Sequence, residues 1–226
     1  MNSQPIKNQV EWQDNLYFKR INEFKEHPIG FNKIVFLGNS LTEGGKNWNK
    51  RFNSVNIINR GISGDFTSGI IARLDEIFYY QPIAIFLLIG LNDIFGINDP
   101  LITAEYVADQ IKHIAKLIKK NCPETKLYVQ TILPIDEDQY LKINGSYPKH
   151  NEPLPEKIRK INNLLINHDF NFYERIDLHT SFLNKDQQTI SSLFKDGVHL
   201  NEEGYQLWAK IIRKHVKNYT IQEDIF

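Results

Sequence analysis

The chain has few of the features that mark secreted, disulfide-linked or membrane-spanning proteins. Its 226 residues include one cysteine, Cys122, so an intrachain disulfide and a cysteine-based zinc site are both excluded. No apolar run approaches the ~20 residues of a membrane-spanning helix. The N-terminal segment also lacks the apolar stretch of roughly 7–15 residues that a secretory signal needs. We therefore expect a protein with no membrane span that is either cytoplasmic or secreted through a signal that is not part of this sequence.

An excess of charge of either sign is absent as well. The 27 lysines and arginines balance 27 aspartates and glutamates, which gives a formal net charge of zero. This balance argues against a protein that binds nucleic acids or anionic membranes through bulk charge. With 41 % hydrophobic and 24 % charged residues, the composition is that of an ordinary globular protein. Length and composition together predict a single domain over residues 1–226.

Short apolar segments alternate with amphipathic segments along the chain. The run IAIFLLIG has no polar face, which is typical of a parallel strand covered by helices on both sides. The alternation therefore predicts an α/β domain with a five-stranded, mostly parallel sheet and helices on both faces. The predicted strands cover residues 33–38, 55–59, 83–90, 126–133 and 171–177. The predicted helices cover residues 67–80, 103–120, 155–168 and 201–217, with an N-terminal helix at about 10–27.

Residues 134–155 interrupt this alternation. The segment reads PIDEDQYLKINGSYPKHNEPLP and combines four prolines with many polar residues, which predicts a long irregular loop. Loops of this length inside a compact domain are often functional. A plain surface excursion explains the same composition equally well.

Ser40 is the first candidate for chemistry. Parallel sheets bind ligands beyond the carboxyl ends of their strands, and Ser40 follows the first strand where the chain turns through Gly38 into a predicted helix. In that place its hydroxyl could attack an acyl carbon and its N–H could stabilise an oxyanion. Alternatively Ser40 caps the helix, as serine commonly does.

A nucleophilic serine requires a base, and His199 is the best candidate of the seven histidines. Asp196 precedes it by three residues in a tight turn that contains Gly197. This spacing lets the carboxylate face the imidazole and hold the tautomer that a base needs. A lone Asp-x-x-His is equally consistent with a surface turn, so the pattern gains meaning only from its combination with Ser40.

Two further residues follow predicted strands and could supply an oxyanion site. Gly61, in NRGISGD, comes after the second strand and has no side chain to keep a ligand from its N–H. Asn92, in GLND, comes after the central strand and carries an amide that can donate to an oxyanion. Each residue is also consistent with a simple turn.

The four segments occur in a characteristic order. Ser40 in GNSLT, Gly61 in NRGISGD, Asn92 in GLND and the pair Asp196 and His199 in DGVH follow one another within residues 33–215. In this order and spacing the chain resembles the SGNH hydrolases, the GDSL-type lipase and esterase family. The residues of these motifs are most similar to those of the branch that contains platelet-activating-factor acetylhydrolase-like proteins and carbohydrate acetylesterases.

The resemblance implies a flavodoxin-like, three-layer α/β/α sandwich that hydrolyses esters without a metal or other cofactor. It implies that Ser40 is the nucleophile, that His199 is the base and that Asp196 orients it. The oxyanion hole would combine the Ser40 N–H with Gly61 and Asn92. The substrate implied is a small-molecule or carbohydrate ester with a short, acetyl-like acyl group.

One residue departs from the family pattern, since the usual Gly-Asp-Ser is Gly38-Asn39-Ser40 here. Asn39 can still form hydrogen bonds, so we expect little loss of activity. Two alternatives stay open: a lysophospholipase or thioesterase with the same triad, and a non-catalytic binding module that kept the fold. Tyr140 and Tyr147 in segment 134–155 favour a sugar ester over a lipid. The sequence carries no signal for the oligomeric state.

Overall fold

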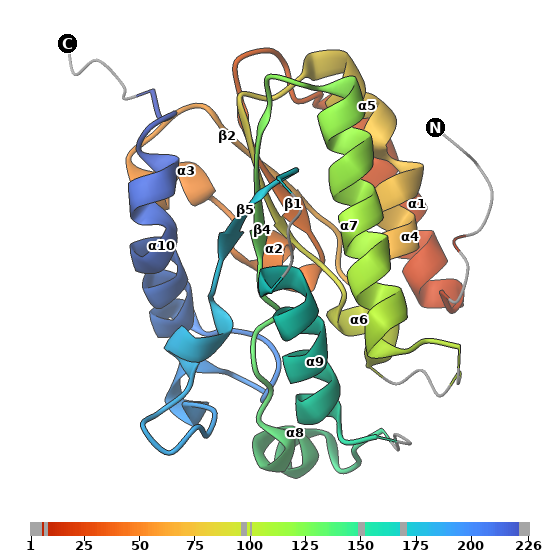
Figure 1. Cartoon of the computed structure of the whole chain (residues 1–226), viewed down its shortest axis with the longest axis vertical. Coiled ribbons are helices and arrows are strands. Elements are labelled where there is room, and N and C mark those ends of the chain that lie inside the picture. The colour runs from red at the N-terminus through yellow and green to blue at the C-terminus, as the bar shows by residue number, and fades with distance from the viewer. Residues whose placement is uncertain are drawn as a thin grey trace.

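The computed structural model describes residues 6, 9–95, 99, 101–148, 152–167 and 171–221. Five parallel strands form one sheet in the order β2-β1-β3-β4-β5, as predicted. The strands are β1 (Ile34–Gly38), β2 (Ile57–Gly61), β3 (Ala84–Leu88), β4 (Lys126–Gln130) and β5 (Glu174–Ile176). Their carboxyl ends point toward the lower edge of Figure 1.

Helices cover both faces of the sheet and produce the predicted three layers (Figure 1). One face carries α3 (Trp48–Phe52) and α10 (Glu202–Val216). The other face carries α4 (Thr67–Ala72), α5 (Leu74–Tyr80), α7 (Ala104–Asn121) and α9 (Leu154–Ile166), with α1 (Glu11–Glu26) beside α4. The short helices α2 (Ser40–Gly44) and α6 (Leu91–Ile94) directly follow β1 and β3. The remaining elements are α8 (Glu137–Asn144) and the 3₁₀ turns η1 (His179–Phe182) and η2 (Ser191–Leu193).

The sheet is held rigid by aromatic packing across its middle strands. Phe36, Phe86 and Tyr128 lie in register on three neighbouring strands, so their side chains point to the same face. Their rings stack at centroid distances of 5.1 and 4.7 Å. Trp48 and Trp208 bury these rings on the side of α3 and α10. Among the described residues, no helix is both long and apolar enough to cross a membrane.

Two predicted elements differ from the structure. Segment 134–155 is not irregular throughout, because α8 forms within it between a side-chain cap and a glycine stop. The Asp136 carboxylate accepts the Gln139 N–H at 2.9 Å, and Gly145 ends the helix at φ +73°. Residues 149–151 of this segment lie outside the described part of the chain. The predicted helix 67–80 is divided at Arg73, which has φ −119°.

Candidate active site

Ser40 is the first residue of α2, immediately beyond β1. The residue before it caps the helix: the Asn39 Oδ1 atom accepts the Leu41 N–H at 3.1 Å, and Asn39 is only 2 % exposed. The sequence left open whether Ser40 caps the helix. In the structure the capping residue is Asn39. The Ser40 N–H belongs to the first turn of α2, where no carbonyl of the helix is available to accept it.

The Ser40 hydroxyl faces an imidazole from the far end of the chain. The Oγ atom lies 3.0 Å from His199 Nε2, and His199 Nδ1 lies 2.8 Å from Asp196 Oδ2. An ionised carboxylate can only accept hydrogen bonds, so the Nδ1 atom carries the imidazole proton. The Nε2 lone pair is then directed at the Ser40 hydroxyl.

The turn that carries Asp196 and His199 is stabilised by the Asp196 carboxylate. Its Oδ1 atom accepts the Val198 N–H at 3.0 Å and the His199 N–H at 2.6 Å, while Gly197 takes a positive φ of +84°. Burial alone would raise the pKa of Asp196. The hydrogen bonds from the side chain and backbone of His199 outweigh this effect and lower the pKa of Asp196 to about 2. The carboxylate is therefore ionised throughout the neutral range.

Segment 134–155 braces this turn. The Asp136 N–H donates to the Gly197 carbonyl at 2.8 Å. A Cβ atom on Gly197 would lie 2.3 Å from the Asp136 carbonyl oxygen and 2.7 Å from the Tyr140 backbone nitrogen. Glycine is thus needed at this position for both its φ angle and its size.

The structure corrects the assignment of Gly61 as an oxyanion donor. The Ile62 N–H bonds to the Gly38 carbonyl of β1 at 3.1 Å. Because successive N–H groups of a strand point to opposite sides, the Gly61 N–H points away from β1 and Ser40. It faces the outer edge of the sheet, where it donates to Asn59 Oδ1 at 2.9 Å. Gly61 is needed instead for packing, since a Cβ atom there would lie 2.1 Å from the Glu43 backbone nitrogen of α2.

The structure points to Gly64 as a candidate oxyanion donor that the sequence did not reveal. Asn92 Nδ2 donates to the Asp65 carbonyl at 2.8 Å, so the Asn92 amide lies against the loop that contains Gly64. Gly64 has a φ of +77°, and its N–H has no hydrogen-bond partner among the described residues. The signal in the sequence was the second glycine of NRGISGD, which lies beyond the strand rather than at its end.

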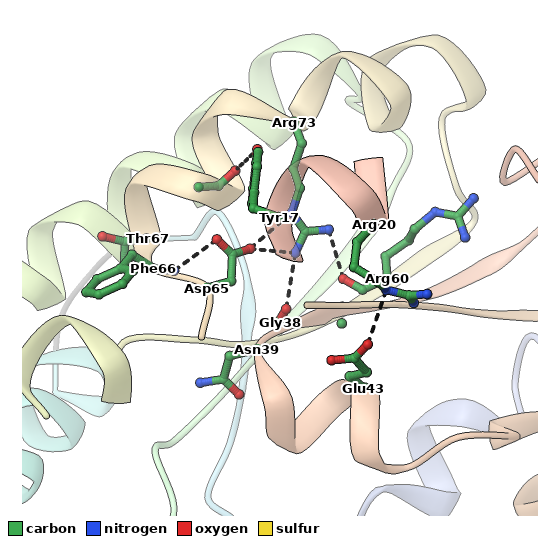
Figure 2. Close-up of polar contacts among 12 residues, drawn as sticks. Tyr17, Arg20, Gly38, Asn39, Glu43, Arg60, Asp65, Phe66, Thr67 and Arg73 are labelled. Atoms are coloured by element: carbon green, nitrogen blue, oxygen red, sulfur yellow. Dashed lines mark hydrogen bonds and ion pairs between the residues drawn. The ribbon is translucent and has the colours of Figure 1, made fainter. Parts of the chain in front are cut away.

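The loop around Gly64 is held from two directions. From α2, the Glu43 carboxylate accepts both the Ser63 N–H, at 2.7 Å, and the Ser63 hydroxyl. From α1, Gln13 Nε2 donates to the Gly64 carbonyl at 3.2 Å. Arg20 of α1 also contacts Glu43, with 3.1 Å between Nε and Oε1 (Figure 2). The N-terminal helix therefore helps to position the backbone next to the candidate nucleophile.

A buried ion pair between Asp65 and Arg73 lies near the end of β1, as Figure 2 shows. Arg73 Nη2 lies 2.9 Å from Asp65 Oδ2, and neither side chain is more than 4 % exposed. The same guanidinium donates to the Arg60 and Gly38 carbonyls at 2.8 and 3.1 Å. These bonds tie the ends of β1 and β2 to α4 and α5.

Asp93 fixes the loop on its other side. Its carboxylate accepts the Thr67 N–H at 3.1 Å and also the Thr67 hydroxyl, and so caps α4. Burial of this carboxyl group raises the pKa of Asp93 to about 6. Within the described part of the chain, no three His, Cys, Asp or Glu side chains gather in a way that could hold a metal ion.

Comparisons with known proteins place the fold and the motifs in one family. The profile of the GDSL-like lipase/acylhydrolase family matches residues 36–207. The alpha1 subunit of platelet-activating factor acetylhydrolase IB from Rattus norvegicus is 28 % identical over 181 residues, which cover 76 % of this chain and 70 % of that protein.

Solved structures agree on the fold. A protein of Bacteroides fragilis assigned as an acylhydrolase superposes with a TM-score of 0.72 at 25 % identity, covering 93 % of this chain and 99 % of that one. A GDSL-like lipase of Bacteroides thetaiotaomicron superposes with a TM-score of 0.71 at 22 % identity, covering 89 % and 97 %. The chain belongs to the GDSL-like lipase/acylhydrolase family and is a carboxylic ester hydrolase.

Proposed function

We propose that the protein hydrolyses short-chain, acetyl-type esters of small molecules or carbohydrates with Ser40, His199 and Asp196 as its catalytic triad. The observation that carries this proposal is the relay of 3.0 Å from Ser40 Oγ to His199 Nε2 and 2.8 Å from His199 Nδ1 to Asp196 Oδ2. The relay aligns a hydroxyl, an imidazole and an ionised carboxylate in the order that acyl transfer requires.

The reaction proceeds in two halves. Ser40 Oγ bonds to the acyl carbon while His199 Nε2 takes the hydroxyl proton, and His199 then gives that proton to the departing alkoxide. The acyl group is now an ester of Ser40. In the second half, His199 removes a proton from water, the hydroxide attacks the acyl carbon, and Ser40 leaves with the proton from His199. Asp196 keeps the imidazole proton on Nδ1 and stabilises the imidazolium.

The oxyanion donors we propose are the Ser40 N–H, the Asn92 amide and the Gly64 N–H. Asn92 and Gly64 belong to segments joined by the 2.8 Å bond from Asn92 to the Asp65 carbonyl. Gly64 takes the place in the proposal that the sequence had suggested for Gly61. Removal of one such donor typically costs about 10²–10³ in kcat.

A cluster of aromatic rings supports the short acyl chain. Phe95, just beyond Asn92, contacts Tyr140 of α8 with ring centroids 5.2 Å apart, and Tyr147 packs on Tyr140 at 5.7 Å. Tyr140 in turn touches Gly197 between Asp196 and His199. The rings pack edge to face against each other, so they do not form the open platform for a sugar ring that the sequence suggested for Tyr140 and Tyr147; in the proposal they form a wall that limits acyl length.

The alternative substrate is an ester with a long acyl chain, as in a lysophospholipase or thioesterase. Leu141 and Ile143 favour it, because both side chains are exposed on α8 at the same end of the sheet. An apolar surface beside an esterase site can bind an alkyl chain.

Turnover of p-nitrophenyl esters tests both readings. We expect kcat/KM to be highest for the acetate and to fall through the butyrate to the octanoate. Ser40→Ala should abolish turnover of the acetate with unchanged folding, whereas the exposed Ser192→Ala should leave it intact. An optimum at eight carbons or more would reject the acetyl preference, and retained activity in pure Ser40→Ala protein would reject the triad.

A further inference from the structure

A hollow of about 470 Å³ lies between α3 and α10, outside the catalytic relay. One wall continues from the nucleophile: Gly45 and Lys46 follow α2, whose first residue is Ser40. The other wall continues from the base, because Glu202 begins α10 three residues after His199. At 1.5 Å per helical residue, Gly45 lies roughly 7 Å from Ser40 along the helix. The two walls of the hollow therefore begin within a few residues of Ser40 and His199.

The hollow is strongly cationic in a chain of zero net charge. Lys46, Lys50, Arg51 and Arg213 line it, against the single carboxylate of Glu202. The arginines are held in place by aromatic rings: the Arg51 guanidinium lies over Tyr205 at 5.1 Å, and that of Arg213 lies over Phe52 at 5.5 Å. Arg213 Nη2 also donates to the Arg51 carbonyl at 3.2 Å. This local charge needs an explanation, because like charges placed together repel each other.

Glu202 partly offsets the charge and orients Arg51. Its two oxygens accept the Arg51 Nη1 and Nη2 protons at 2.7 and 2.9 Å. The Arg51 side chain is only 15 % exposed, whereas Lys46 and Lys50 are exposed residues. A largely buried arginine beside the exposed side chains of Arg213, Lys46 and Lys50 can bind a carboxylate, sulfate or phosphate group.

The direction of the proposed reaction connects the hollow to one half of the substrate. The acyl oxygen is directed toward Asn92 and Gly64, which follow β3 and β2. His199 must reach the alcohol oxygen to protonate it. The alcohol half therefore leaves on the side of His199. Three residues after His199 the chain enters α10, which forms one wall of the hollow.

We propose that this cationic hollow is a subsite for an anionic group on the alcohol half of the ester, so that the enzyme prefers esters of acidic alcohols such as uronic acids or sugar phosphates. The inference rests on the proposed function, since it assigns the hollow to the leaving group of the same reaction. The anionic group is attracted by the positive charges of Lys46, Lys50, Arg51 and Arg213. The carboxylate of Glu202 weakens this attraction.

A pair of acetate esters that differ in charge tests the subsite. The probes are 4-acetoxybenzoate, which is anionic, and 4-acetoxybenzamide, which is neutral and of similar size. The quantity measured is the kcat/KM of the anionic ester divided by that of the neutral ester, because intrinsic reactivity cancels when this ratio is compared between variants. The double variant Lys46→Glu/Lys50→Glu should lower the ratio by about tenfold, given the usual strength of exposed ion pairs. Glu202→Gln should raise it by about two- to fivefold.

The control is Lys119→Glu, which makes the same kind of charge reversal on α7, on the opposite face of the sheet. It should leave the ratio unchanged. Salt should lower the ratio of the wild type toward that of the double variant, because exposed charges are screened at high ionic strength. Equal ratios in all these proteins would overturn the subsite.

Two readouts separate this inference from the proposed function. Hydrolysis of the neutral ester, with its loss in Ser40→Ala, reports on the triad alone and should not change in the Lys119→Glu control. Binding of inorganic phosphate by calorimetry, measured in Ser40→Ala protein, reports on the hollow alone. Phosphate should bind several-fold more weakly when Lys46→Glu/Lys50→Glu is added, and equal binding with and without these changes would also overturn the subsite.

Discussion

Asp196→Asn isolates the orienting role of the carboxylate, because the backbone decides how the new amide must lie. In the wild type, Asp196 Oδ1 accepts the Val198 and His199 N–H groups, and Oδ2 accepts the imidazole proton of His199. An asparagine has only one oxygen, and the two backbone donors hold it on their side. Its NH₂ group then faces His199 Nδ1. The imidazole must accept there, so its proton moves to Nε2, where it can no longer take the proton of Ser40.

The size of the effect follows from this tautomer. A base that presents N–H to the nucleophile cannot act, and in comparable triads the same exchange lowers kcat on the order of 10⁴. We expect a loss of that order with p-nitrophenyl acetate and a nearly unchanged KM, since Asp196 does not touch the substrate. Asp186→Asn, at an exposed position, is the matched control and should retain full activity.

The same substitution should change the pH dependence of stability in a defined direction. The pKa of Asp196 is lowered to about 2 in the folded protein, below the usual ~3.9 of an unfolded chain. The ionised carboxylate therefore stabilises the fold above the unfolded pKa, and this stabilisation is lost as the pH falls through about 2. The Tm difference between wild type and Asp196→Asn should be largest near neutral pH and shrink on acidification. Activity of Asp196→Asn within tenfold of the wild type would refute the tautomer reasoning.

Three further substitutions separate chemistry from support around the oxyanion site. Gly61→Ala places a Cβ atom 2.1 Å from the Glu43 nitrogen, so calorimetry should find Tm lower by about 5–10 °C, as expected for a clash of about 2–3 kcal/mol; an unchanged Tm would contradict the packing role. Asn92→Asp keeps the size of the side chain but removes both amide protons, so kcat should fall by about 10²–10³, and a kcat like that of the wild type would remove Asn92 from the oxyanion hole. Glu43→Ala releases Ser63, and the resulting shift of the loop should lower kcat by about ten- to a hundredfold with little change in Tm; a loss of Tm without a loss of kcat would show that the contact serves folding alone.

The sequence predicted the sheet well because its strands are marked by strong local signals. The apolar run that contains Ala84–Leu88 is buried at all five positions, as expected for a strand covered on both faces. Ser40 and His199 were predicted as candidates from their place after a strand and before the last helix. Their meeting at 3.0 Å joins residues that are 159 positions apart in the sequence, and the fold that brings them together is not described by their spacing alone.

The errors arose where long-range pairing decides the outcome. Gly61 follows the predicted strand, yet the direction of its N–H depends on the pairing of β2 with β1, in which Gly61 lies opposite Gly38. The register between two strands cannot be predicted from the residues around Gly61 alone. Likewise, α8 depends on a cap from Asp136 and on the packing of Tyr140 against Gly197, neither of which the polar composition of the segment reveals.

The contacts of α1 bear on where the catalytic unit begins. The family profile starts at residue 36, beyond the end of α1 at Glu26. Yet Gln13 holds the Gly64 carbonyl, and Tyr17 donates to the Gly69 carbonyl at 3.0 Å. A fragment trimmed to residues 36–207 would keep Ser40, Asp196 and His199 but lose both of these anchors, together with the first two residues of β1. Residues that precede the region of family similarity therefore help to position the loop that contains Gly64.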